Sequence, residues 1–206
     1  MLAAVHQIWG TSFIRTITEM EQDQERDIVL RILGGERDAY ALLVDAYQGA
    51  IFNLACRMTG SLQDADDLAQ ETFIRAYRRL RYFDPGKRFF TWIYTIGLNL
   101  VRNHLKKRGR AAVRDTSHRA DSEADSQAEW PAEQALIRFQ ELRRLEEALR
   151  KLPVDLREAV VLRFYQGLSF EEIAAIMDAS LSAVKMRVYR GVEKLKGLMD
   201  EIDRLT

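Results

Sequence analysis

The chain has 206 residues and no formal net charge, because 31 basic residues balance 31 acidic ones. With 47% hydrophobic and 30% charged residues, it has the composition of a globular protein and not of a disordered one. The single cysteine excludes a disulfide framework and a cysteine-rich zinc site, and the three histidines are too far apart to suggest metal ligands. No stretch reaches the roughly 18 consecutive apolar residues of a membrane span, so no direct membrane insertion is expected.

Residues 1–23 are expected to be an N-terminal extension. The first twenty residues are fairly apolar, but they lack the basic start and the small-residue cleavage site of a secretory signal. Two interpretations remain open: an ordered extension, or an upstream start that precedes a domain beginning at Met20. The second is favoured.

Three helices are predicted in the first half of the chain. Apolar residues recur at steps of three and four over residues 39–58, and again over residues 65–80. Residues 84–86, Asp-Pro-Gly, signal a turn, and a third helix is predicted at about 89–107. Cys56 lies inside the first helix, where packing is its expected role.

The second half begins with a segment that has no helical periodicity, residues 109–131, which is predicted to be a tether. Four more helices are predicted after it. Ser169 and Glu172 have the spacing of a capping box, which begins a short helix. A turn at 178–180 and a longer basic helix follow. This layout is typical of a helix-turn-helix, with Asp178 in a left-handed position that glycine often occupies.

Charge is distributed unevenly along the chain. Residues 72–114 contain twelve basic residues and one acidic residue, and residues 185–196 contain five basic residues and one acidic residue. Residues 115–133, between these blocks, contain six acidic residues and one basic residue. Two basic blocks around an acidic segment suggest two polyanion-binding modules on a linker, although each block alone also fits the solvated face of a helix. The aromatic residues within the first block favour nucleic acid as the partner.

The predicted fold class is therefore all-α, with two small helical domains joined by a flexible linker. The first domain is expected at 24–108 and the second, which contains the helix-turn-helix, at 135–206. Residues 109–134 are expected to form the acidic linker between them.

Two stretches of the sequence resemble the extracytoplasmic-function (ECF) group of the bacterial sigma-70 family, in particular its RpoE-like members. Residues 64–110 contain DDLAQETF and the helix WIYTIGLN, and they resemble the second conserved region of that family. Residues 152–195, from LPVDLREAVV to YRGVEKL, resemble its fourth conserved region. The resemblance implies an alternative sigma factor that binds the β and β′ subunits of core RNA polymerase and directs the enzyme to promoter DNA.

By resemblance, the acidic helix in the first stretch docks on a coiled-coil of the largest polymerase subunits. An acidic patch beside an apolar stripe suits a basic, amphipathic partner helix. The residues implied in core-polymerase binding are Asp66, Asp67, Leu68, Gln70, Glu71 and Phe73, of which Phe73 is assigned to packing first. Two other interpretations remain open: a divalent-metal site, because Asp64, Asp67 and Glu71 share a helix face, and a solvated helix start whose acids favour the helix dipole.

Opening the −10 promoter element requires bases to be held out of the stack by apolar walls, cations and amide or hydroxyl groups. Residues 82–103 supply all three kinds of group. By resemblance, the residues that bind −10 DNA are Phe83, Lys87, Arg88, Ile96, Asn99, Arg102 and Asn103. Phe83 and Lys87 belong to a loop that would cradle a flipped base. Asn99 lies in mid-helix among apolar residues, where an unpaired amide is unfavourable, so a working role is expected for it; Trp92 is assigned to packing first.

The second helix of the helix-turn-helix is expected to enter the major groove of the −35 element. By resemblance, the residues that bind −35 DNA are Ser182, Lys185, Met186, Arg187, Tyr189 and Arg190. Lys185 and Arg190 are expected to read bases, whereas Lys194 is expected to bind phosphate. Asp178 and Met186 depart from the common family pattern, which leaves the base preference open.

The prediction is a cytoplasmic initiation factor that is not an enzyme and needs no cofactor or metal. An anti-sigma factor that covers the polymerase-docking surfaces is the expected regulator and would be able to hold the chain at the inner membrane. The acidic linker would occupy the RNA exit path of polymerase. Two alternatives come from other classes: a helix-turn-helix regulator that uses only residues 132–206 for DNA, and an acid-dependent nuclease. The nuclease would rest on Asp64, Asp66, Asp67 and Glu71.

Overall fold

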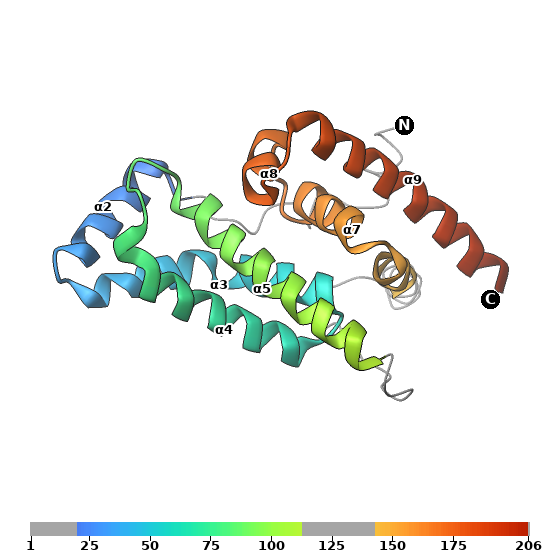
Figure 1. The fold of residues 1–206 in the computed structure, drawn as a ribbon, viewed down its shortest axis with the longest axis horizontal. Helices are drawn as coiled ribbons and strands as arrows, with labels where there is room; N and C mark the ends of the chain where they lie inside the picture. Colours follow the sequence, from blue (N-terminus) through green and yellow to red (C-terminus); the bar gives the residue numbers. More distant parts are fainter. Residues whose placement is uncertain (1–19, 113–142, 206) are drawn as a thin grey trace, which may run out of the picture.

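The computed structural model describes residues 20–112 and 143–205, and all regular elements within these residues are helical (Figure 1). In chain order they are α2 (Gln22–Leu33), η1 (Arg37–Ala39), α3 (Tyr40–Thr59), α4 (Leu62–Arg79), η2 (Leu80–Tyr82), α5 (Phe89–Ala112), a helical segment at 143–151, α7 (Val154–Val160), η3 (Val161–Tyr165), α8 (Phe170–Met177) and α9 (Leu181–Leu205). The all-α prediction is confirmed. The proposals for residues 1–19 and for most of the linker lie outside the described residues.

The first half is built on α3, α4 and α5, which lie side by side in Figure 1. The three-and-four spacing of α3 places Leu43, Tyr47, Ile51 and Leu54 in the core, each at most 1% exposed. The break between α3 and α4 has two local causes. Gly60 ends α3 in the left-handed conformation, at φ 72°, and the Ser61 side chain caps α4 by accepting a hydrogen bond from the Asp64 amide at 3.2 Å.

Two elements of the first half differ from the prediction. The short helix α2 was not predicted from its sequence pattern, because its apolar face is narrow and consists of Ile28, Val29 and Ile32. Helix α5 continues five residues beyond the predicted end, through Gly109 to Ala112. Basic residues in the final turns of α5 interact favourably with the negative end of the helix, which supports this extension.

The second half contains the predicted helix-turn-helix. Ser169 and Glu172 form the predicted capping box at the start of α8. Asp178 ends α8 with φ 50° and ψ 55°, so the aspartate takes the left-handed conformation as expected. Helix α9 then crosses close to α7 at Gly191, where a β-carbon would lie 2.5 Å from Val160 Cγ2. This close approach requires glycine at position 191.

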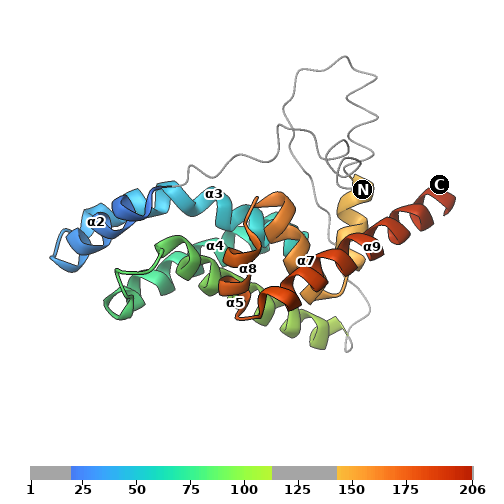
Figure 2. The ribbon, with the colours of Figure 1, turned by 90° about the horizontal axis from the view of Figure 1, so that it is seen from above.

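The two halves pack against each other, with α8 beside α5 and α7 beside α3 (Figures 1 and 2). Buried apolar residues of both halves belong to one continuous core. The Tyr94 hydroxyl donates to Gln166 Oε1 at 2.8 Å, and Arg157 Nη1 donates to the Met58 carbonyl at 2.7 Å. In this conformation the two helical domains are therefore joined by a packed and hydrogen-bonded interface.

Candidate nucleic-acid and partner interfaces

The acidic surface of α4 divides into an exposed polar layer and a buried apolar layer. Asp66, Asp67 and Gln70 are exposed, and Gln70 donates to Asp66 Oδ2 at 2.9 Å. Leu68 and Phe73 are only 9% and 7% exposed, so they support the helix from below. Glu71, which is half-buried, pairs with Arg75 at 2.6 Å.

Beside this acidic surface lies a groove between α3 and α4 with a volume of about 670 Å³. Helix α4 contributes Asp66, Gln70 and Ile74 to its wall, and α3 contributes Val44 and Phe52 among others. The α3 wall was not predicted. The signal for it was present, because Val44 and Phe52 are apolar residues eight positions apart that lie off the main buried stripe of α3.

Asp64 does not belong to the exposed acidic surface. Its Oδ2 atom lies 3.2 Å from Arg108 Nη1 and 3.4 Å from His104 Nε2, so it links the start of α4 to α5. This pairing removes one of the three acids on which the metal-site interpretation rested. Within residues 20–112 and 143–205, no group of three or more His, Cys, Asp and Glu side chains is arranged to hold a metal ion.

The predicted −10 surface lies along α5 and the loop before it. Lys87, Asn99 and Asn103 are exposed, and Ile96 is half-buried. The side chain of Asn99 is solvated and accepts a hydrogen bond from Arg102 Nη1 at 3.3 Å. The expected role of Asn99 was argued from apolar surroundings and an unpaired amide, and neither is found here; the role itself stays a prediction.

Phe83 is placed differently from the expectation. It is 6% exposed, and its ring packs against those of Phe89 and Trp92 at centroid distances of 5.7 and 4.9 Å. In this conformation the ring fills the core under the loop and cannot stack on a base. Tyr82, which is 73% exposed, is the aromatic side chain that the neighbouring position presents to solvent. Tyr82 lies in the predicted segment 82–103, but the sequence analysis assigned it no role in the site.

Both arginines of the predicted −10 surface meet carboxylates from the second half of the chain. Arg102 donates two hydrogen bonds to Glu158, at 2.8 and 2.7 Å, and this interaction raises the pKa of the guanidinium. Arg88 Nη1 lies 3.9 Å from Glu172 Oε1. These pairings were not predicted, because nothing in the sequence places 158 and 172 beside α5.

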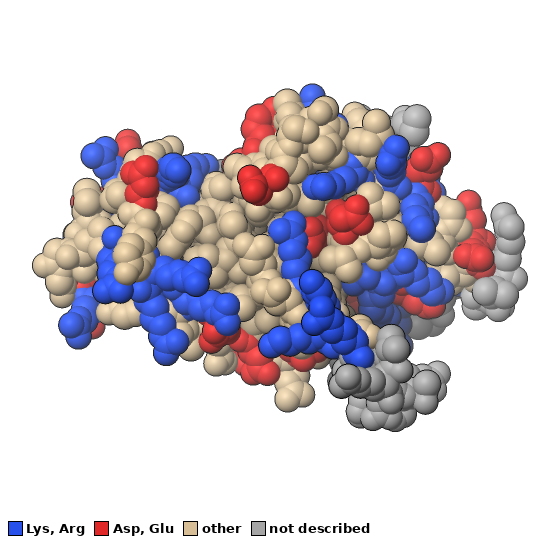
Figure 3. All heavy atoms as spheres, viewed as in Figure 1, with Lys and Arg blue, Asp and Glu red and all other residues tan. Residues whose placement is uncertain are grey.

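The predicted −35 surface is presented on the outer face of α9. Ser182, Lys185 and Arg190 are exposed, as are Met186 and Tyr189, at 51% and 63%. Arg187 is half-buried, in contrast to the other five residues of the predicted set. Figure 3 shows Lys and Arg side chains gathered along α9 and over the C-terminal half of α5. The outward face of α9 thus remains accessible while α8 covers part of α5.

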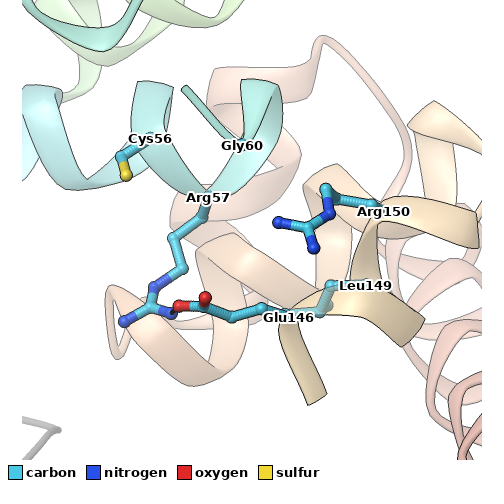
Figure 4. Close-up of a pocket in the computed structure, with 6 residues that line it drawn as sticks. All are labelled: Cys56, Arg57, Gly60, Glu146, Leu149 and Arg150. Atoms are coloured by element: carbon cyan, nitrogen blue, oxygen red, sulfur yellow. Dashed lines mark hydrogen bonds and ion pairs between the residues drawn. The ribbon is translucent and has the colours of Figure 1, made fainter. Parts of the chain in front are cut away.

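A small pocket of about 20 Å³ lies where the end of α3 meets the helical segment 143–151 (Figure 4). Arg57 and Glu146 face each other across it and form an ion pair at 2.6 Å. Cys56 also lines the pocket, and burial raises the pKa of its thiol, which disfavours the reactive thiolate. The pocket is too small for a ligand and belongs to the junction between the two halves.

Comparison with known proteins shows the family to which the chain belongs. The sigma-70 region 2 model matches residues 43–111, and the sigma-70 region 4 model matches residues 142–195. Together the two matches cover more than half of the chain. The chain belongs to the sigma-70 family and is an ECF sigma factor of the RpoE-like group, that is, a transcription initiation factor.

Individual relatives are similar over most of their length. The RNA polymerase sigma-H factor of Pseudomonas aeruginosa is 36% identical over 182 residues, which cover 85% of this chain and 94% of the relative. The ECF RNA polymerase sigma-E factor of Escherichia coli K12 is 34% identical over 189 residues, which cover 89% of this chain and 98% of the relative.

Two solved complexes resemble the whole two-domain arrangement. The sigma factor RpoE of Bartonella quintana, in complex with the anti-sigma factor NepR, has a TM-score of 0.64 and 26% identity, and the match covers 78% of this chain and 96% of that one. CnrH in complex with the cytosolic domain of CnrY has a TM-score of 0.61 and 28% identity, and the match covers 86% of this chain and 97% of that one. No helix in the described part of the present chain is both long and apolar enough to cross a membrane.

Proposed function

We propose that this sigma factor binds the β and β′ subunits of core RNA polymerase and directs the enzyme to promoters with two sequence elements. The single observation that supports this most strongly is that three distinct surfaces lie on one chain: an acidic surface on α4 with a groove beside it, an amide- and cation-bearing face on α5, and an exposed basic face on α9. Bond-making chemistry then belongs to polymerase, and the sigma factor needs no cofactor and acts in the cytoplasm.

The polymerase-docking surface is the exposed polar layer of α4 together with the adjoining groove. Asp66, Asp67 and Gln70 offer acceptors to a basic helix, and Phe52 and Ile74 offer apolar contacts in the groove. A partner helix that is basic on one face and apolar on the next would match both the acidic layer and the apolar groove. An anti-sigma factor would compete for this same surface, in keeping with the complex of the RpoE relative with NepR. A membrane-anchored anti-sigma factor would hold the chain at the inner membrane.

The −10 surface comprises the exposed residues Lys87, Asn99 and Asn103, with Ile96 and the two paired arginines beside them. Amide groups can hydrogen-bond base edges, and cations can follow the backbone of a single strand. Phe83 contributes by supporting the loop from within the core. In the −35 element, α9 would lie in the major groove with Lys185 and Arg190 toward the bases.

The direct test is complex formation followed by promoter opening. The chain and core polymerase, mixed in equal amounts, are expected to elute as one complex from a size-exclusion column. The complex should make −10 thymines reactive to permanganate, and Asn99→Ala should weaken that opening by about 1–3 kcal/mol, the usual range for one base contact. Failure of the two components to elute together would contradict the proposal.

A further inference from the structure

The N-terminus of α5 has no capping side chain from its own segment. The Arg88 carbonyl accepts from the Trp92 amide at 3.4 Å, so Arg88 occupies the capping position, but its guanidinium has no acceptor atom to offer a helix N–H group. The amides of Phe89 and Phe90 instead donate to Oε2 and Oε1 of Glu25, at 2.9 and 3.2 Å. A carboxylate on α2, more than sixty residues away in sequence, therefore replaces the local cap.

Glu25 is almost completely buried, at 1% exposure, and its carboxylate is surrounded by donors. The Tyr47 hydroxyl on α3 donates to Oε1, and Arg88 Nε lies 3.8 Å from Oε2. The positive end of α5 adds a further favourable interaction with the negative charge. A buried carboxylate is strongly unfavourable without such partners, so this arrangement fixes α2, α3 and α5 to one another at a single point.

The position of α5 at this point determines where its exposed side chains lie. A helix is rigid over a few turns, so a shift or rotation at Phe89 is passed on to Asn99 and Asn103. The loop before α5 is tied to the same point, because Phe83 packs on Phe89 and Trp92. The residues of the proposed −10 surface that lie on α5 are therefore held through that helix by the contact with Glu25, and Arg88 lies beside Glu25 directly.

We propose that Glu25 is a positioning residue for −10 recognition: it touches no DNA, but it holds α5 and Arg88 in the geometry that reads the opened strand. This role rests on the proposed function. It also gives α2 a task in promoter recognition, although α2 lies outside the span matched by the region 2 model.

The test uses holoenzyme made from core polymerase and the full chain. A template is first selected by wild-type holoenzyme from a library randomised at both promoter elements, and single-base variants of its −10 and −35 elements are then prepared. Glu25→Gln preserves size but removes the charge and places an NH₂ group against helix N–H donors. Asp27→Asn is the matched control, because Asp27 is an exposed acid on the same helix.

The measured quantity is the ratio of transcription from the selected template to that from each variant. A smaller active fraction of protein lowers all rates equally and leaves the ratio unchanged, so the ratio separates positioning from stability. For Glu25→Gln we expect −10 discrimination to fall about tenfold, the size of one good base contact, while −35 discrimination stays as in the wild type. Asp27→Asn should change neither ratio.

An equal loss of transcription on all templates, or no loss of −10 discrimination, would overturn the role of Glu25 while leaving the proposed function intact. If Glu25→Gln does not fold, Glu25→Asp decides, since it keeps the charge but its shorter side chain cannot reach both amides; an unchanged −10 ratio there would equally overturn the role. Failure of wild-type holoenzyme to select any template would instead overturn the proposed function, and the role of Glu25 with it.

Discussion

Five neighbouring side chains on α9, Ser182, Lys185, Met186, Tyr189 and Arg190, all point into solvent. They differ in what they can do at a DNA surface. The Arg190 guanidinium can make two hydrogen bonds to the O6 and N7 atoms of guanine, whereas a lysine ammonium acts more as a point charge. Lys194, one turn further along α9, is exposed as well and suits a phosphate contact.

The first prediction separates these two kinds of contact. Arg190→Ala and Lys185→Ala should each cost about 1–3 kcal/mol of binding and relax the preference at one base pair of the −35 element. Lys194→Ala should weaken binding to all sequences alike and reduce the slope of log affinity against log salt by about one. The measurement is a binding titration against single-base variants at two salt concentrations. Equal losses for all variants in Arg190→Ala and Lys185→Ala would assign both residues to the DNA backbone.

Helix α4 has a buried apolar face and an exposed polar face. Leu68 and Phe73 hold the helix on the core, and Asp66, Asp67 and Gln70 face outward. Because the outward acids do not carry the packing, their charge can be changed without loss of the helix. Surface ion pairs such as Glu71–Arg75 contribute at most about 1 kcal/mol.

The second prediction uses this separation. Reversal of charge at both positions, Asp67→Lys with Glu71→Lys, should weaken binding to core polymerase by at least about tenfold, because the acidic patch would then repel a basic partner. Helix content, measured by circular dichroism, should be unchanged. The control reverses two exposed acids elsewhere in the first half, Asp27 and Asp38. If the α4 variant and the control bind labelled polymerase equally well in a titration, α4 is not the docking surface.

The sequence predicted helices more successfully than it predicted which single side chains are buried or exposed. Helices α3, α4 and α8 follow from periodicity and local capping at Ser61 and Ser169, which are short-range features. Helix α2 was missed because its stability comes from packing and from the contact of Glu25 with α5, which no local pattern records. Asn99 was expected to lie among apolar residues and Phe83 to be available to DNA, but the exposure of a side chain depends on which helices meet.

At the scale of the whole molecule, the two halves are joined by polar contacts as well as by apolar packing. Glu158, 2% exposed, holds Arg102 with two hydrogen bonds, and Arg57 pairs with Glu146 and lies 4.2 Å from the Tyr165 ring centroid. A sequence cannot predict such contacts without the relative placement of two domains. Arg102 belongs to the proposed −10 surface. It cannot keep both hydrogen bonds to Glu158 while its guanidinium binds the backbone of a DNA strand.

The third prediction concerns this junction. Glu158→Gln removes the charge and one of the two acceptor oxygens, and it should weaken the contact between the halves by about 1–3 kcal/mol. The radius of gyration of the free chain, measured by small-angle X-ray scattering, should increase. Glu147→Gln is the matched control in the second half, because Glu147 is exposed and pairs with Lys151. An unchanged radius in the Glu158 variant would show that the Arg102–Glu158 contact is not needed to hold the halves together.

The central claim is that one chain carries polymerase binding, −10 capture and −35 reading. Run-off transcription with purified core polymerase tests it most directly, with templates randomised at two blocks upstream of a fixed start. Transcripts should appear only when chain and core polymerase are both present, and the transcribed templates should share two sequence blocks. DNA binding without transcripts would indicate a plain helix-turn-helix regulator, and metal-dependent cleavage of the template would indicate a nuclease; either result would contradict the account.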